Sequence, residues 1–246
     1  MRLDSFLHDN GYATSRTEAK AFVLEGLVTV NGKVVNKPSF DVSAEAQISV
    51  DKTSHRFVSR GGYKLEGALN SFSVDPTGRD CLDIGASSGG FTDCLLQRGA
   101  KRVIAVDSGT AQLVDSLRCD PRITVMEQCN ARYLSAEDLE YIPTLTVMDV
   151  SFISATYIFE AIRSCMANGG DFICLIKPQF EVGKEGLGKG GIVKDDKHRK
   201  RAVDKVVAAA SNFGFKLLGL IDSPILGGDG NREFLAHFKL DVGDGV

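Results

Sequence analysis

Residues 83–93 read Asp-Ile-Gly-Ala-Ser-Ser-Gly-Gly-Phe-Thr-Asp, and this stretch decides the fold of most of the chain. It follows a short apolar run and opens an amphipathic one, which predicts a turn from a strand into a helix. Gly85, Gly89 and Gly90 leave the turn without side chains, so a ligand can approach the backbone and the positive end of the helix. Asp107 ends the next apolar run, where a carboxylate can accept hydrogen bonds from a ribose diol. We therefore expect a nucleotide-type ligand; the alternative is a tight turn that serves only helix packing.

The spacing of these glycines distinguishes between cofactors. The turn reads Gly-x-x-x-Gly-Gly where dinucleotide-binding folds have Gly-x-Gly-x-x-Gly, which argues against a nicotinamide oxidoreductase. An acidic residue, Asp83, stands two positions before the first glycine, at the end of the strand. This pattern favours S-adenosylmethionine.

From Lys64 onward, apolar runs and amphipathic stretches alternate. Strands are expected near residues 80–84, 102–107, 122–127, 144–150, 171–177, 215–223 and 232–240. Helices are expected near residues 64–71, 89–98, 111–118, 135–141, 154–167 and 195–213. Alternation predicts an α/β fold, a parallel sheet with helices on both faces, and the S-adenosylmethionine pattern favours the Rossmann-like methyltransferase kind. No helix separates the last two strands, which predicts an antiparallel end to the sheet.

The first 50 residues follow a different pattern. A capping box at Ser15–Glu18 opens a helix, and Asn31-Gly32 between two apolar runs predicts a hairpin. We therefore expect a small α+β domain over residues 1–58, a linker over 59–63, and the α/β domain over 64–246.

Composition excludes several classes of protein. Among 246 residues, 43% are hydrophobic and the net charge is −3, as in soluble globular proteins. No apolar run approaches the roughly 20 residues that span a bilayer, and the N-terminus lacks a signal-peptide core, so we expect a cytoplasmic protein without a membrane partner. The six cysteines form no C-x-x-C pair, so neither disulfides nor a metal site is expected.

Several polar side chains fall at the expected carboxyl ends of strands, where open parallel sheets bind ligands. Asn130, after the third strand, is a candidate partner for an adenine edge. Asp149 and Lys177 follow the fourth and fifth strands, and charges are seldom buried unpaired. Either the two residues face a substrate or they form a salt bridge that holds two strand ends together.

Three motifs of the N-terminal domain, Arg-Leu-Asp, Ser-Arg-x-x-Ala-Lys and Gly-x-Val-x-Val-Asn-Gly, resemble the RNA-binding module of ribosomal protein S4. In that family the second helix and the hairpin face structured RNA, which implies phosphate contacts for Arg16 and Lys20. The alternative is a capping domain whose charges are merely solvated.

The larger domain carries Ser-Arg-Gly-Gly-Tyr-Lys-Leu, Asp-Val-Ser-Phe-Ile and Ile-Lys-Pro-Gln-Phe-Glu. Together with the glycine turn, these motifs resemble the TlyA family of ribosomal RNA methyltransferases, often labelled haemolysins and related to the heat-shock (FtsJ/RrmJ) RNA methyltransferase. The resemblance implies ribose 2′-O-methylation of cytidine in 16S or 23S RNA, with ribosomal RNA or ribosomal subunits as partners. It also implies a catalytic set in the chain order Lys64, Asp149, Lys177 and Glu233. Lys177 would act either as a neutral base or as a charged group that steers the hydroxyl.

The cofactor set expected around S-adenosylmethionine comprises Asp83, Gly85, Ala86, Ser87, Gly89, Gly90, Phe91, Asp107, Asn130 and Asp149. Residues 177–216 hold 10 Lys and Arg against 5 Asp and Glu, as a polyanion site would. Within them Lys184 and Lys189 lie in a glycine-rich loop that we expect to contact RNA; the alternative is a basic surface loop. Two rival functions are an RNA-binding assembly factor without catalysis and a haemolysin. The sequence shows no strongly amphipathic membrane segment that would support a haemolysin.

Overall fold

The computed structural model describes residues 1–246 except 14, 25, 44, 52–55, 228–229 and 242–246. The chain divides into two compact units, Met1–Ser59 and Arg60–Val246. The first helix of the second unit, α3, spans Gly61–Phe72. Residues 61–63, expected in a linker, are therefore helical.

The N-terminal unit packs two helices against a small antiparallel sheet. The helices are α1 (Leu3–Asp9) and α2 (Arg16–Leu24), and the sheet has the order β2 (Lys33–Val34), β1 (Val28–Val30), β3 (Ile48–Val50). The Ser15 hydroxyl accepts a hydrogen bond from the Glu18 amide at 3.1 Å, as the capping sequence predicts. Leu3, Leu7 and Val23 are fully buried between helices and sheet.

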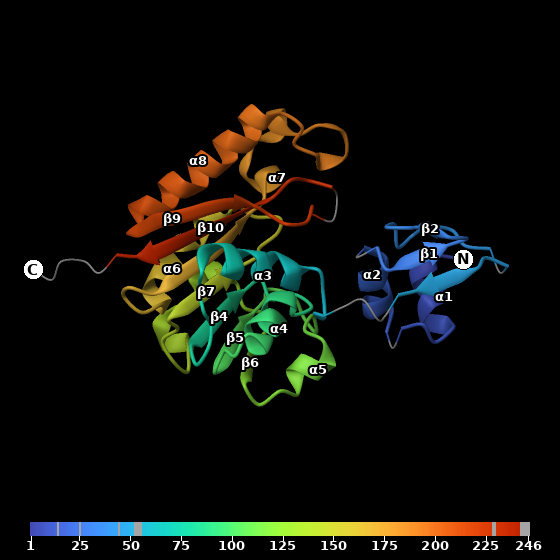
Figure 1. Ribbon diagram of the computed structural model, residues 1–246, viewed down its shortest axis with the longest axis horizontal. Helices are drawn as coiled ribbons and strands as arrows, with labels where there is room; N and C mark the ends of the chain where they lie inside the picture. The colour runs from blue at the N-terminus through green and yellow to red at the C-terminus, as the bar shows by residue number, and fades with distance from the viewer. Residues whose placement is uncertain (14, 25, 44, 52–55, 228–229, 242–246) are drawn as a thin grey trace, which may run out of the picture. The chain divides into compact units, whose positions relative to one another are not determined.

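The second unit is built on a seven-stranded sheet with the order β6-β5-β4-β7-β8-β10-β9 (Figure 1). Its strands are β4 (Asp80–Ile84), β5 (Arg102–Val106), β6 (Ile123–Met126), β7 (Leu145–Met148), β8 (Asp171–Ile176), β9 (Phe215–Asp222) and β10 (Phe234–Leu240). The first five run parallel, and β10 is antiparallel to both β8 and β9. The predicted fold class is confirmed, including the antiparallel end.

Helices lie on both faces of this sheet (Figure 1). They are α3, α4 (Gly90–Gln97), α5 (Asp115–Arg118), α6 (Phe159–Cys165), α7 (Pro178–Glu181) and α8 (Asp196–Asn212). Short 3₁₀ turns are η1 (Ala131–Tyr133), η2 (Ala136–Asp138), η3 (Ala155–Tyr157), η4 (Lys184–Gly186) and η5 (Lys189–Gly191). On one face, α6 and α8 share a core with Phe172, Phe215 and Phe238, all fully or almost fully buried.

Three expected helices differ from the structure. In place of the helix expected over 154–167, the 3₁₀ turn η3 is followed by α6, which begins only at Phe159. The helix expected over 135–141 begins with a capping box between Ser135 and Asp138 but is a single 3₁₀ turn, because the backbone is already extended at Leu139. The helix expected over 111–118 begins only at Asp115. The Glu127 carboxylate accepts hydrogen bonds from the backbone amides of residues 111–113, and Ala111 has a φ of +51°. These bonds and this conformation keep the segment out of the helix.

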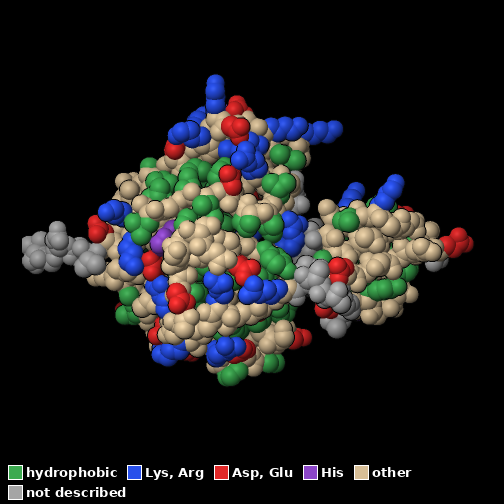
Figure 2. All heavy atoms as spheres, viewed as in Figure 1, with side chains coloured by type: hydrophobic (Ala, Val, Ile, Leu, Met, Phe, Trp, Pro, Cys, Tyr) green, Lys and Arg blue, Asp and Glu red, His purple; other side chains and the backbone are tan. Residues whose placement is uncertain are grey.

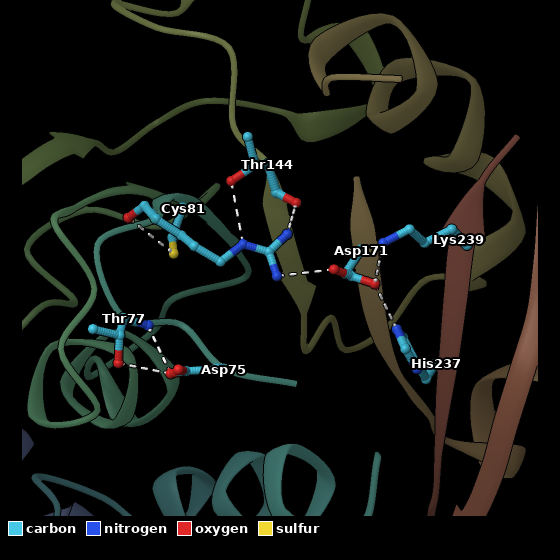
Figure 3. Close-up of polar contacts among 8 residues, drawn as sticks. Asp75, Thr77, Cys81, Thr144, Asp171, His237 and Lys239 are labelled. Carbon is cyan, nitrogen blue, oxygen red and sulfur yellow. Dashed lines mark hydrogen bonds and ion pairs between the residues drawn. The ribbon is translucent and has the colours of Figure 1, made fainter. Parts of the chain in front are cut away.

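At the amino ends of the parallel strands, one carboxylate links several segments of the sheet. Asp171, the first residue of β8, accepts hydrogen bonds from Arg79 at 2.8 Å, His237 at 2.9 Å and Lys239 at 3.1 Å (Figure 3). Burial raises the pKa of Asp171, but the bonds from His237, Arg79 and Lys239 outweigh it and hold that pKa well below its usual range. Arg79 also reaches the backbone oxygen of Thr144, so the cluster joins the segments before β4, β7 and β8.

Candidate active site

A cavity of about 540 Å³ opens at the carboxyl edge of the sheet, opposite the Asp171 cluster. Its walls come from the segments that follow β4, β5, β6 and β7. They include Gly85, Ser87, Asp107, Asn130 and Asp149. Parallel sheets bind ligands at this edge, and the volume falls in the range of cofactor sites, about 300–1,000 Å³.

The glycines of the turn after β4 are required first by the protein itself. Gly85 has a φ of +82°, and a Cβ there would lie 2.3 Å from the backbone oxygen of Asp149. Gly89 has a φ of +99°, and a Cβ there would lie 2.3 Å from Leu117 Cδ1. Gly90 is buried as the first residue of α4. Of these three, only Gly85 lines the cavity. The glycines therefore make room partly for neighbouring segments of the protein and not only for a ligand.

Asp107 is oriented toward the cavity by two backbone amides. Its Oδ2 accepts from Ser87 N at 2.8 Å and its Oδ1 from Gly109 N at 2.7 Å. Each carboxylate oxygen has about two acceptor positions, so one remains on each for a ribose diol. This arrangement fits the expected partner of Asp107.

Glu127, which the sequence did not single out, fixes the loop beside Asp107. Burial raises the pKa of its carboxyl, but hydrogen bonds from the amides of Leu113, Ala111 and Gln112 and from Arg118 outweigh it and lower the pKa to about 2. These bonds hold the loop in a position where Gly109 and Gln112 form part of the cavity wall. The only sequence signal was an acid at the end of an apolar run.

Asp83 lies behind the cavity wall. It is fully buried, its Oδ2 accepts from Thr92 Oγ1 at 2.6 Å, and its Oδ1 has no partner among the described residues. Burial, reinforced by the nearby charge of Asp149, raises the pKa of Asp83 to about 7. Ala86 and Phe91 are likewise buried, and the cavity wall includes neither.

Asn130 does line the cavity, at the start of η1. Its Oδ1 accepts from the Arg132 amide at 3.1 Å, so the side chain caps this turn. Half of the ten expected cofactor residues thus border the cavity, and the other half build the turn around it.

The four expected catalytic residues form two ion pairs. Lys177 Nζ lies 2.5 Å from Asp149 Oδ1, and Lys64 Nζ lies 2.7 Å from Glu233 Oε2. The first is an ion pair by distance rather than a well-directed hydrogen bond, since Asp149 Oδ1 has no hydrogen-bond partner among the described residues. The second is a buried hydrogen bond. Each ammonium is thereby paired with its own carboxylate.

Strand register brings the two pairs to one edge. Phe234 of β10 pairs with Ile176 of β8, so Glu233 and Lys177 occupy the adjoining position. Helix α3 supplies Lys64 from the sheet face that it covers and contacts β10. Asp149, directly after β7, belongs both to this group and to the cavity wall.

Two further residues of the segment after β7 were not foreseen. Ser151 Oγ accepts a hydrogen bond from Lys177 Nζ at 2.7 Å. Phe152 lines the cavity, is 92% exposed, and has a φ of +66°, a conformation that bulky residues rarely adopt. Strained, exposed residues of this kind cluster at functional sites.

Comparison with known families agrees with this geometry. The family described as FtsJ-like methyltransferase matches residues 57–240, and the S4 domain matches residues 1–48.

The chain belongs to the FtsJ-like methyltransferase family.

Its relatives span the whole chain. Hemolysin A of Brachyspira hyodysenteriae is 43% identical over 239 residues, 97% of this chain and 99% of that one. The 16S/23S rRNA (cytidine-2'-O)-methyltransferase TlyA of Mycobacterium tuberculosis is 43% identical over 97% of this chain and 89% of its own. A solved Streptococcus thermophilus protein that carries a hemolysin name superposes with a TM-score of 0.79 at 42% identity, covering 98% and 89% of the two chains.

The expected RNA contacts lie on two surfaces of this FtsJ-like methyltransferase. Arg16 and Lys20 are exposed on one face of α2 in the S4 domain. Lys184 and Lys189 are exposed in η4 and η5, just before α8. Figure 2 shows Lys and Arg side chains, with some acidic ones among them, over the part of the methyltransferase unit where α7 and α8 lie.

In the described part of the chain, no helix combines the length and the apolar character needed to cross a bilayer. The same residues include no cluster of three or more His, Cys, Asp or Glu side chains that could hold a metal ion.

Proposed function

We propose that the protein is an S-adenosylmethionine-dependent methyltransferase that modifies the ribose 2′-oxygen of cytidine in ribosomal RNA, in the 16S molecule, the 23S molecule or both. One observation carries the proposal: Asp149 borders the cofactor cavity and forms an ion pair with Lys177. The cavity and the amine that would act on the ribose hydroxyl therefore share one residue. The relative named as an rRNA (cytidine-2'-O)-methyltransferase supports the substrate.

The residues at the cavity fit the cofactor by their own chemistry. Asp107 has free acceptor positions for a ribose diol, and Gly85 and Ser87 present backbone at the cavity wall. When bound, S-adenosylmethionine supplies an electrophilic methyl group on a sulfonium centre. Asp83 lies buried behind the cavity wall, and its Oδ1 has no hydrogen-bond partner among the described residues.

Lys177 acts on the acceptor, because a ribose hydroxyl is a poor nucleophile until its proton begins to leave. Its Nζ is held between Asp149 Oδ1 and Ser151 Oγ at the cavity margin. A neutral amine there would take the proton; an ammonium would hold the oxygen and stabilise its developing charge. Either way, correct alignment of the oxygen with the methyl group supplies much of the acceleration.

Two basic surfaces hold the RNA. Arg16 and Lys20 of the S4 domain contact phosphates of a structured region, and Lys184 and Lys189 contact phosphates beside the start of α8. Phe152, exposed at the cavity margin, offers a ring on which a base can stack.

The test is methyl transfer to ribosomal subunits with labelled cofactor, followed by alkaline digestion. A 2′-O-methyl group blocks the oxygen that attacks the adjoining phosphate, so the methylated position resists alkaline cleavage. Lys177→Ala should abolish transfer while cofactor and RNA still bind. Lys177→Arg should also fail if the lysine is the base, because a guanidinium stays charged; retained activity would identify the charged role.

A methyl group on a base, with the phosphodiester still labile, would refute the ribose assignment. Tight RNA binding with no transfer by the unaltered protein would instead identify an assembly factor without catalysis.

A further inference from the structure

We propose that Glu181 is a positioning residue that fixes the two loops carrying Lys177 and Asp149 relative to each other. The inference rests on the proposed function, since it assigns a role within the same reaction. Glu181 is the last residue of α7, the single turn that follows Lys177.

The Glu181 carboxylate joins three separate segments. Its Oε1 accepts from the Ala155 amide at 2.8 Å, and its Oε2 accepts from Ser154 Oγ at 2.5 Å. Both donors lie in the segment that begins at Asp149. Lys205 of α8 donates to the same Oε2 at 3.0 Å and to the Glu181 backbone oxygen at 3.1 Å.

The carboxylate is buried, with only 2% of its side chain exposed. A buried carboxylate is stable only when its oxygens are satisfied, and here three donors satisfy them. Because every donor sits on an element other than α7, the bonds form only when the three segments hold one arrangement. Glu181 therefore specifies their relative position as well as contributing to stability.

Lys177 is tied closely to this anchor. The peptide between them is a helical turn that begins with Pro178, and the Phe180 amide donates to the Lys177 backbone oxygen at 3.0 Å. On the other side, Asp149 and Ser151 precede Ser154 by only a few residues. A shift at Glu181 thus changes the separation of Lys177 Nζ from Asp149 Oδ1 and Ser151 Oγ, the contacts that hold the amine in place.

The experiment compares the full-length protein with Glu181→Gln and with Asp204→Asn. The control removes a carboxylate from α8 whose ion pair with Lys200 is exposed on both sides and which takes no part in the hydrogen bonds of Glu181. Three quantities are measured: cofactor stoichiometry and affinity by calorimetry, the single-turnover rate of methyl transfer at saturating RNA, and the acetylation rates of Lys177 and Lys64 by mass spectrometry.

Glu181→Gln should bind cofactor at full stoichiometry and unchanged affinity, yet transfer methyl about 10- to 100-fold more slowly per bound cofactor, as expected for a displaced reacting group. Acetylation of Lys177 should rise several-fold, while Lys64, held by Glu233, keeps its rate. Asp204→Asn should match the unaltered protein in every measurement, and Glu181→Asp, which keeps the charge, should recover part of the rate.

A purely structural role would lower cofactor stoichiometry and leave the rate per bound cofactor intact, which would overturn the proposal. Equal Lys177 acetylation in Glu181→Gln and the unaltered protein would overturn it too. If the unaltered protein transfers no methyl group, the proposed function fails, and the acetylation rates still decide whether Glu181 positions Lys177.

Discussion

Gly85 packs against the backbone of the loop that carries Asp149, and replacing it with alanine tests this contact. Its φ of +82° strains any L side chain, and its Cβ would lie 2.3 Å from the Asp149 backbone oxygen and 2.9 Å from the carbonyl carbon. Neither atom can rotate away as a side chain would. The loop carrying Asp149 must therefore move by several tenths of an ångström or more.

Gly78 offers a matched control. Its φ is +70°, but nothing lies within 4 Å of a Cβ placed there. Gly78→Ala should therefore show only the left-handed strain, about 1–2 kcal/mol. Gly85→Ala adds overpacking against backbone, typically about 1–3 kcal/mol. For a chain of this size that addition lowers the melting temperature by about 2–12 °C below that of the control.

Catalysis should separate the two variants more than stability does. Displacement of Asp149 by about 1 Å changes the position of Lys177 and can reduce the rate of methyl transfer about 100-fold. Gly78→Ala, far from the cavity wall, should keep its rate. The assay is methyl transfer per molecule of bound cofactor, together with thermal unfolding. Equal melting temperatures and equal rates in the two variants would refute the contact between Gly85 and Asp149.

Three further predictions follow from the same structure. Asp83 has a folded-state pKa of about 7 against about 3.9 when unfolded, so the stability that its neutral form contributes is complete below about pH 4 and lost as the pH rises to about 7. Urea unfolding should show that Asp83→Asn removes this fall, of the order of 4 kcal/mol; an unchanged pH dependence would contradict it. Asp107→Ala should weaken cofactor binding at least about tenfold by loss of hydrogen bonds to a charged group, measured by calorimetry, with RNA affinity as the control. Arg16→Glu with Lys20→Glu should weaken ribosomal RNA binding and reduce the salt slope by about 1 for each lost phosphate contact, leaving cofactor affinity unchanged; normal binding across a salt titration would show that α2 is not the RNA anchor.

Strands could be predicted from the sequence because buried parallel strands are short apolar runs that end abruptly in charged or small residues. β4 illustrates this, since Cys81 to Ile84 are all buried and Gly85 follows at once. Helices in the loops could not be predicted equally well. Pro178 follows the end of β8, as a proline that stops a strand would, but a proline is also favoured at the first position of a helix, and α7 begins there.

Lys177 and Asp149 could be identified because the strand-end rule needs only local patterns and the order of strands. Ser151, Glu127 and Glu181 could not, because each acts through partners 9 to 27 positions away or through a loop whose path the local sequence does not determine. Ser151 stands within the motif Asp-Val-Ser-Phe-Ile, but the sequence gives this serine no partner. Its contact with Lys177 exists only once β7 and β8 lie side by side.

The salt-bridge alternative for Asp149 and Lys177 shows what separates a structural ion pair from a functional one. The two residues do form an ion pair, as that alternative predicted. Yet the Asp171 carboxylate, at the other edge of the same sheet, is held by three donors, whereas Asp149 lines a cavity of about 540 Å³ and its Oδ1 makes no directed hydrogen bond among the described residues. A carboxylate whose acceptor positions are filled by the protein can only hold the fold together. A carboxylate that is ion-paired and also borders a cavity can bind a ligand as well. At Asp149 the ion pair keeps Lys177 in place beside that cavity.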